Sequence, residues 1–167
     1  MFLPCVTNLT REKIARELDT RGPESCMEET LQELSENNPE VLDMATRCAA
    51  SFGDRYQKIM LELCIFYRLL VAEFKAIDPA LRLLNPFPRV TRQTRNELVR
   101  QIDEQGLEAF TTNATKHLAQ YNPELLQMAH NSAERHKSYL PMIQGFALLY
   151  KALVEQAAAG TVSATVH

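Results

Sequence analysis

Tryptophan is absent from the 167-residue chain, and glycine occurs only five times. Proline and glycine stand at a few separate points, so long stretches rich in Leu, Ala, Glu, Gln and Arg run without interruption. These side chains lose little freedom in a helix and are good helix formers. With 46% hydrophobic and 23% charged residues, the composition is that of a globular chain. We therefore expect an all-α protein.

The chain has no excess of positive charge and no long uninterrupted hydrophobic run. Its formal net charge is −3, which gives no electrostatic basis for binding nucleic acid or an anionic membrane. The N-terminal residues "MFLPCVTN" lack the basic and apolar regions of a signal peptide. The longest hydrophobic stretch, residues 59–74, is interrupted by Glu62, Arg68 and Glu73, so we do not expect it to span a membrane. A cytoplasmic protein is the expectation.

The four cysteines, Cys5, Cys26, Cys48 and Cys64, are irregularly spaced and form neither a CxxC motif nor a disulfide framework. Reduced thiols are therefore expected. Cys48 and Cys64 lie on apolar helix faces, where a thiol usually packs as a small hydrophobic group. We interpret them as core residues and not as nucleophiles.

The chain contains an internal repeat. The segment "NPEVLDMA" at residues 38–45 returns as "NPELLQMA" at residues 122–129, 84 positions later. After residue 54 the offset becomes 83, and Tyr67 falls on Tyr150. At the first offset, identical residues include Pro4, Val6, Thr7, Thr10, Arg11, Arg16, Asp19, Gly22, Glu24, Leu34, Asn38, Pro39, Glu40, Leu42, Met44, Ala45 and Ala49. Two segments in phase over this length predict a duplicated helical subdomain.

The offset divides the chain into two repeats. Residues 1–76 are the first helical repeat, and residues 90–157 are the second. A Pro-containing linker, residues 77–89, separates them, and the small polar tail, residues 158–167, is expected to be disordered. Each repeat is predicted to hold about four helices. We expect the two repeats to form one compact domain.

The fourth helix of each repeat, near residues 55–76 and 138–157, is apolar around most of its circumference. Such a helix must be central or lie at an interface. We therefore expect the two long helices to pack against each other across a pseudo-twofold axis, with the shorter helices outside. The same apolar girth would allow a homodimer.

Local signals predict where the shorter helices begin. Thr94, followed three residues later by Glu97, suggests a capping box at the start of a helix over residues 94–105. Asn38 and Asn122 each precede a Pro-Glu pair and are expected to cap the next helix with the side-chain oxygen. The repeated "NPE" is therefore interpreted as a helix start.

Three histidines in the second repeat, His117, His130 and His136, could suggest a metal site. Helical metal motifs place ligands at i and i+4. His130 and His136 are six residues apart, so they lie about 120° apart around a helix. The first repeat has no histidines at the matching positions. We interpret the group as solvated surface residues and expect no metal and no cofactor.

The second predicted helix of the first repeat is acidic. It contains no Lys or Arg, and its five carboxylates are Glu24, Glu28, Glu29, Glu33 and Glu36. A helix–turn–helix outline is present, but the phosphate backbone of DNA would repel this helix. The equivalent helix of the second repeat is less acidic and contains Asn113, Lys116 and His117. DNA binding is therefore a weak alternative, restricted to the second repeat.

Polar residues kept in both repeats are the candidate interaction residues. Arg16 and Asp19 could pair on one helix surface, as could Arg100 and Asp103. Arg11 and Arg95 have no local partner and could contact the other repeat or a shared ligand. The full set of candidate interaction or ligand residues is Arg11, Arg95, Arg16, Arg100, Tyr67 and Tyr150.

No catalytic constellation is found, and we expect a non-catalytic protein. The favoured function is protein–protein interaction, as a regulatory or adaptor module, with another protein as partner. The alternative is a helical protein that binds an apolar small molecule in a pocket lined by Met60, Phe66, Tyr67, Phe146 and Tyr150. A DNA-binding regulator and a metal-dependent enzyme are less favoured.

Overall fold

The computed structural model describes residues 3–77, 80 and 86–166, with side chains up to residue 159. Within these ranges the chain forms helices and no strands, which confirms the all-α expectation. None of the described helices is long and apolar enough to cross a membrane. The helices are α1 (Asn8–Arg21), α2 (Pro23–Asn37), α3 (Pro39–Ala50), the short 3₁₀ helix η1 (Gly53–Arg55), α4 (Tyr56–Lys75), α6 (Arg92–Gln105), α7 (Leu107–Tyr121), α8 (Pro123–Arg135) and α9 (Tyr139–Val166).

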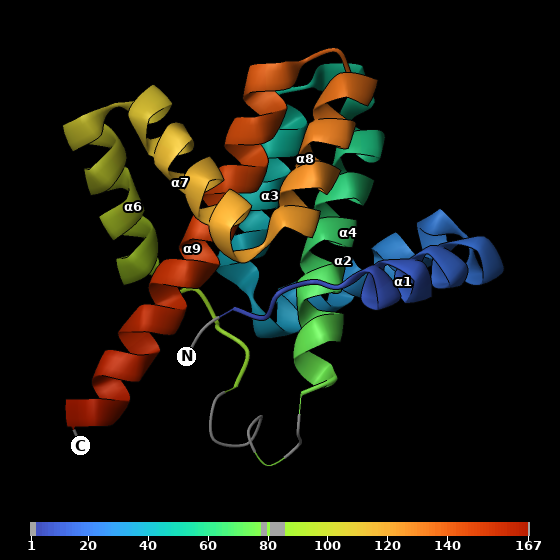
Figure 1. Ribbon diagram of the computed structural model, residues 1–167. Helices are drawn as coiled ribbons and strands as arrows, with labels where there is room; N and C mark the ends of the chain where they lie inside the picture. The colour runs from blue at the N-terminus through green and yellow to red at the C-terminus, as the bar shows by residue number, and fades with distance from the viewer. Residues whose placement is uncertain (1–2, 78–79, 81–85, 167) are drawn as a thin grey trace.

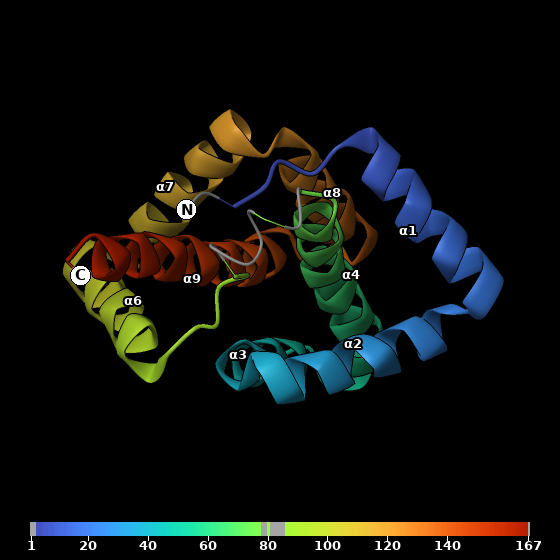
Figure 2. The same cartoon turned by 90° about the horizontal axis from the view of Figure 1, so that it is seen from below.

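Helices α3, α4, α8 and α9 form the centre of the molecule (Figure 1). The pairs α1/α2 and α6/α7 lie on opposite sides of this centre, as the view from below also shows (Figure 2). Residues 3–77 and residues 86–166 thus form two halves. Between the halves the main helix contacts are those of α3 with α9 and of α4 with α8. The long helices α4 and α9 meet through Phe66 and Phe146, whose ring centroids are 5.0 Å apart.

The core follows from helical spacing on the two long helices. On α4 the buried residues Ile59, Leu63, Phe66 and Leu70 recur every three to four positions, which places them on one face. Phe66 and Phe146 are fully enclosed, at 0% exposure. Burying one such side chain contributes about 1.5–3 kcal/mol. The central helices therefore supply the hydrophobic contacts that join the halves.

Helix α6 begins two residues earlier than the sequence predicted, and α1 begins in the same way. The N-cap residues are Thr7 and Thr91, whose side-chain oxygens accept from the amides three residues later, at 3.4 and 3.2 Å. The predicted capping box at Thr94 is therefore wrong. Thr94 lies inside α6, buried, and its hydroxyl donates to Gln156 Oε1 at 2.6 Å. Glu97 instead accepts from Arg100 Nε at 2.9 Å.

Glycine ends the first helix of each half. Gly22 has φ 85° and Gly106 has φ 88°, and each also stands at the start of the following helix. A side chain at positive φ is strained, which explains glycine at both turns. Most of the predicted linker, residues 77–89, falls outside the described residues. At the other end, the backbone of α9 continues as helix to Val166, through most of the tail for which the composition indicated disorder.

Candidate functional site

Asn38 holds the segment that leads into the other half. It is at the N-cap position of α3, but its side chain does not cap the helix, so this part of the sequence prediction is wrong. Its Oδ1 accepts from the amide of Val90 at 2.9 Å, and its Nδ2 donates to the carbonyl of Pro88 at 2.7 Å. Nδ2 also donates to the hydroxyl of Tyr67 at 3.3 Å. The amide group is thus used across the junction of the halves.

Asn122 makes the equivalent contacts in the opposite direction. It too occupies an N-cap position, that of α8, without a side-chain capping bond. Its Oδ1 accepts from the amide of Val6 at 3.0 Å, and its Nδ2 donates to the carbonyl of Pro4 at 2.8 Å. Both asparagines are buried. Each half therefore carries an asparagine that binds the extended segment before the other half's first helix.

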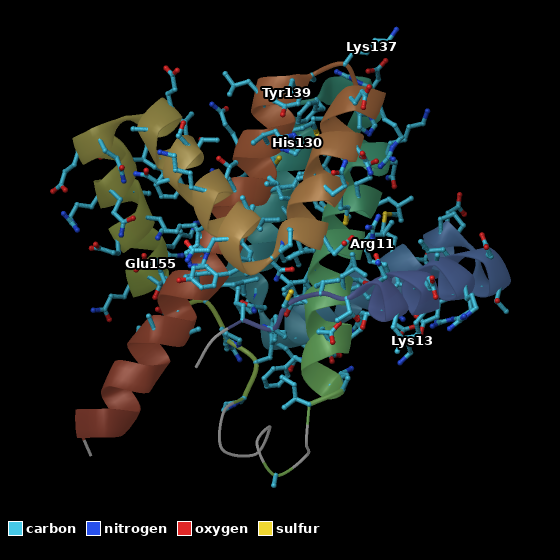
Figure 3. The ribbon with its side chains drawn as sticks, viewed as in Figure 1. Arg11, Lys13, His130, Lys137, Tyr139 and Glu155 are labelled. Carbon is cyan, nitrogen blue, oxygen red and sulfur yellow. The ribbon has the colours of Figure 1, made fainter. Side chains whose placement is uncertain are left out.

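Arg11 and Arg95 also bridge the halves. Arg11, on α1, is labelled in Figure 3. It forms an ion pair with Glu124 at the start of α8. Arg95, on α6, contacts Glu40 and Asp43 of α3, both at 2.7 Å. These carboxylates hold the pKa of the Arg95 guanidinium above its usual value, although burial opposes this shift. The structure therefore gives each of these arginines a carboxylate partner in the other half.

The other two candidate arginines, Arg100 and Arg16, lie on α6 and α1. Arg100 pairs with Glu97 and Glu104, not with the predicted Asp103, and these contacts raise its pKa. The Arg100 guanidinium holds the pKa of Glu97 at about 2. Arg16 is exposed on α1, and the described residues include no ion pair between it and Asp19. The pairing expected from the i, i+3 spacing is thus not formed on either helix.

Tyr67 and Tyr150 are buried in the core, and burial raises the pKa of each to about 12. Met60, Phe66 and Phe146 are at most 2% exposed. Tyr67 additionally lines a surface cavity of about 470 Å³, where its ring meets that of Phe87 at 5.5 Å. The aromatic residues of the two long helices thus fill the centre, and Tyr67 reaches the edge of a cavity.

Cys26, Cys48 and Cys64 behave as packing residues, whereas Cys5 is exposed. All four are free, and Cys26 and Cys64 are buried. Burial raises the pKa of Cys48 to about 11 and that of Cys64 to about 12. At these values the thiolate, which is the nucleophilic form, is scarce near neutral pH. This agrees with the interpretation of Cys48 and Cys64 as core residues.

The histidines have three different environments. His130 stacks on Tyr139, with ring centroids 5.4 Å apart and a hydrogen bond between Nδ1 and the phenol oxygen (Figure 3). The ring of His117 lies 4.6 Å from that of Tyr121, tilted by 41°, and its Nδ1 is buried without a hydrogen-bond partner among the described residues. Burial, and secondarily Lys151, lowers the pKa of His117. In the described part of the chain, no three His, Cys, Asp or Glu side chains converge in a way that could hold a metal ion.

His136 is not a solvated surface residue, and that interpretation is wrong for it. Its side chain is 9% exposed and pairs with Glu62 of α4. The same carboxylate accepts from Ser132 Oγ at 2.7 Å and from Arg135 Nε at 3.0 Å. We call these four residues, Glu62, Ser132, Arg135 and His136, the Glu62 cluster. It joins α4 to the end of α8 and thus joins the two halves.

The Glu62 cluster is not arranged for nucleophilic catalysis. In a catalytic triad the imidazole accepts the hydroxyl proton of serine, whereas here the carboxylate accepts it. Ser132 is also 0% exposed, so a substrate cannot reach its hydroxyl. The sequence signal for the cluster is Glu62, one of two carboxylates in the hydrophobic stretch 59–74. Its partners lie some 70 residues later, so the local pattern does not indicate them.

The outer face of α2 is the main acidic surface identified from the sequence. The helix turns Cys26, Thr30 and Leu34 inward, at i, i+4 and i+8. Glu24, Glu28 and Glu36 are exposed on the other side. Of the remaining carboxylates, Glu29 pairs with Arg21 and Arg68, and Glu33 is half-buried. We call Glu24, Glu28 and Glu36 the α2 acidic face.

Comparison of the chain with protein-family models, with curated proteins and with solved structures finds no match.

Proposed function

We propose that the chain is a duplicated helical protein whose halves are related by a pseudo-twofold axis. The sequence identities at offsets of 84 and 83 support this proposal. Equivalent turns also have nearly the same backbone angles, such as φ −151° and ψ 60° at Asn38 against −150° and 62° at Asn122. The reciprocal hydrogen bonds of the two asparagines are a third argument. On this proposal the recurring polar residues Arg11, Arg95, Asn38 and Asn122 serve to join the repeats.

We further propose that the protein is a non-catalytic, cytoplasmic interaction module, of regulatory or adaptor type, and that its α2 acidic face binds a basic surface of another protein. The single observation that carries this proposal is the contrast between α2 and α7. Helix α7 occupies the equivalent place in the second repeat with one acidic residue, Glu108, and one basic residue, Lys116. The fold therefore does not require a row of carboxylates on this helix.

The chemistry of the α2 acidic face suits a charged partner. Exposed carboxylates without opposite charges on the same helix create a negative potential that steers a basic surface into contact. Such contacts act mainly on the association rate and weaken as salt concentration rises. The expected complex is therefore reversible and salt-sensitive. Nucleic acid is disfavoured as a partner by the same charge.

The test is charge reversal on α2 with a matched control. The variant Glu24→Lys/Glu28→Lys/Glu36→Lys is compared with Glu12→Lys/Glu108→Lys/Glu134→Lys, which changes the net charge equally at exposed sites on other helices. Affinity capture from the source cell, at low and at high salt, is followed by identification of bound proteins. The proposal expects a partner that is retained by the control and lost by the α2 variant. Equal capture by both variants, or no partner at all, contradicts it.

A small-molecule function remains the second candidate, because Tyr67 lines the 470 Å³ cavity together with Val71, Phe74 and Phe87. Such a volume is within the range of ligand pockets. Native mass spectrometry of the purified protein, followed by denaturation, tests for a bound apolar molecule. The variant Val71→Trp should remove such a molecule by filling the cavity. A ligand retained by that variant would place the binding elsewhere.

A further inference from the structure

A second cavity lies where the start of α4 meets the end of α8. Its volume is about 420 Å³, and its lining combines three cations, one histidine and one carboxylate. The lining residues are Arg55, Lys58, Leu61, Glu62, Arg135 and His136. This end of the molecule is marked in Figure 3 by Lys137, at the turn between α8 and α9. The cavity is separate from the α2 acidic face.

The only carboxylate of this lining is already engaged. Glu62 accepts hydrogen bonds from Ser132 and Arg135 and pairs with His136. Arg55 and Lys58, by contrast, form no ion pair with any described residue. Two cations at one cavity without a counter-charge repel each other, and an anion between them removes that repulsion. The lining therefore has unused positive charge.

Arg55 and Arg135 are held in place by contacts that leave donors free. Arg55 Nη1 donates to the carbonyl of His136, and its guanidinium lies 5.5 Å from the centre of the Phe52 ring. Arg135 uses Nε and Nη2 on Glu62, which leaves Nη1 for another acceptor. A fixed guanidinium loses little freedom on binding and suits the geometry of phosphate oxygens. Lys58 is exposed and adds a mobile charge.

The corresponding place in the other half lacks this chemistry. The positions of Arg55 and Lys58 are occupied 83 residues later by Ser138 and Pro141, and that of Glu62 by Gly145. The positions of Arg135 and His136 are occupied 84 residues earlier by Ser51 and Phe52. There Gly145 packs directly on Cys48. Under the proposed duplication, the same junction thus folds without any of the charged groups.

We propose that this cavity binds the phosphate group of a small molecule, with Arg55, Arg135 and Lys58 as the binding residues. Three cations match the double negative charge of a phosphate better than the single charge of a carboxylate. Glu62 and His136 are positioning residues that fix Arg135 and Arg55. The site involves neither α2 nor its proposed partner protein, so it can be tested separately.

The experiment measures binding of pyrophosphate to the full chain by isothermal titration calorimetry at low ionic strength, with acetate as a carboxylate probe. We expect one pyrophosphate per chain and weaker binding of acetate. Lys58→Gln should weaken pyrophosphate binding about fivefold, as for loss of one exposed ion pair. Arg55→Gln should weaken it about tenfold or more, because it removes charge-assisted hydrogen bonds. Lys116→Gln, an exposed lysine on α7, is the matched control and should bind like the unchanged protein.

Several results would overturn the proposal. These are no saturable binding at millimolar pyrophosphate, equal affinity in the Lys58→Gln and Lys116→Gln variants, or acetate binding as tight as that of pyrophosphate. Lys58 makes no described contact that the fold needs, so its variant remains informative if Arg55→Gln does not fold. A single-stranded oligonucleotide is the last probe. If it binds and pyrophosphate does not displace it, the surface binds nucleic acid and the small-molecule proposal fails.

Discussion

The asparagine contacts between the halves give the sharpest test of how this fold is held together. In Asn122→Ala, the amide of Val6 and the carbonyl of Pro4 lose their partners, at 3.0 and 2.8 Å. Val6 is 1% exposed, so water cannot readily replace the bond to its amide. A buried backbone group left without a partner costs about 1–3 kcal/mol. We therefore expect the free energy of unfolding to fall by about 2–4 kcal/mol, a large part of the total for a typical domain.

The assay is equilibrium unfolding in urea, followed by circular dichroism. Asn38→Ala should cost as much as Asn122→Ala, because it removes the equivalent bonds to Val90 and Pro88. Asn113→Ala is the control, since Asn113 is exposed on α7, and its effect should stay within about 0.5 kcal/mol. If both buried asparagines behave like Asn113, the contacts contribute little and the proposed role in joining the halves is refuted.

Three further predictions concern single positions. Gly145→Ala should destabilise the protein by about 1–3 kcal/mol, because a Cβ there would lie 2.5 Å from Cys48 Sγ. Adding Cys48→Ala should restore much of the lost stability, and no rescue would mean that the strain lies elsewhere. Glu62→Ala should lower the free energy of unfolding, measured by urea denaturation, by about 1–3 kcal/mol, because His136 and Ser132 lose their shared acceptor. A smaller loss in Glu62→Gln would separate the contribution of hydrogen bonding from that of charge. The lowered pKa of His117 means that the folded state binds a proton at this side chain less readily than the unfolded state does. The stability of the protein should therefore decrease as pH falls below about 6.5. His117→Gln should flatten this pH dependence, as measured by thermal unfolding at different pH values.

The helices were largely predictable because their ends depend on local chemistry. Pro39 and Pro123 begin α3 and α8, as the repeated Asn-Pro-Glu predicts, and Gly22 and Gly106 end α1 and α6 at positive φ. The predicted start at Thr94 is misplaced, because the sequence offers several threonines that could cap. Only the course of the backbone shows that Thr7 and Thr91 occupy that position.

The contacts between the halves could not be derived in the same way. The position of Asn38 before Pro39 predicts a local capping bond, but the same side-chain atoms bind Pro88 and Val90, some 50 residues away. Glu62 likewise stands out as a charge in an apolar stretch, but nothing in that stretch indicates Ser132 and His136 as its partners. A sequence pattern reports on neighbours along the helix. Partners across the molecule depend on how the helices are packed.

The hydrogen bonds of Asn122 to the N-terminal segment also bear on the order in which the protein folds during synthesis. Val6 and Asn122 are 116 residues apart, so the first segment leaves the ribosome long before its partner exists. Helices form quickly from neighbouring residues, whereas contacts between distant residues are slow to close. The N-terminal segment around Val6 therefore stays without its hydrogen-bond partner until α8 has been made. We expect binding of this segment to Asn122 to be the last and slowest step of folding. A nascent chain stopped before Asn122 should leave the segment around Val6 accessible to proteases.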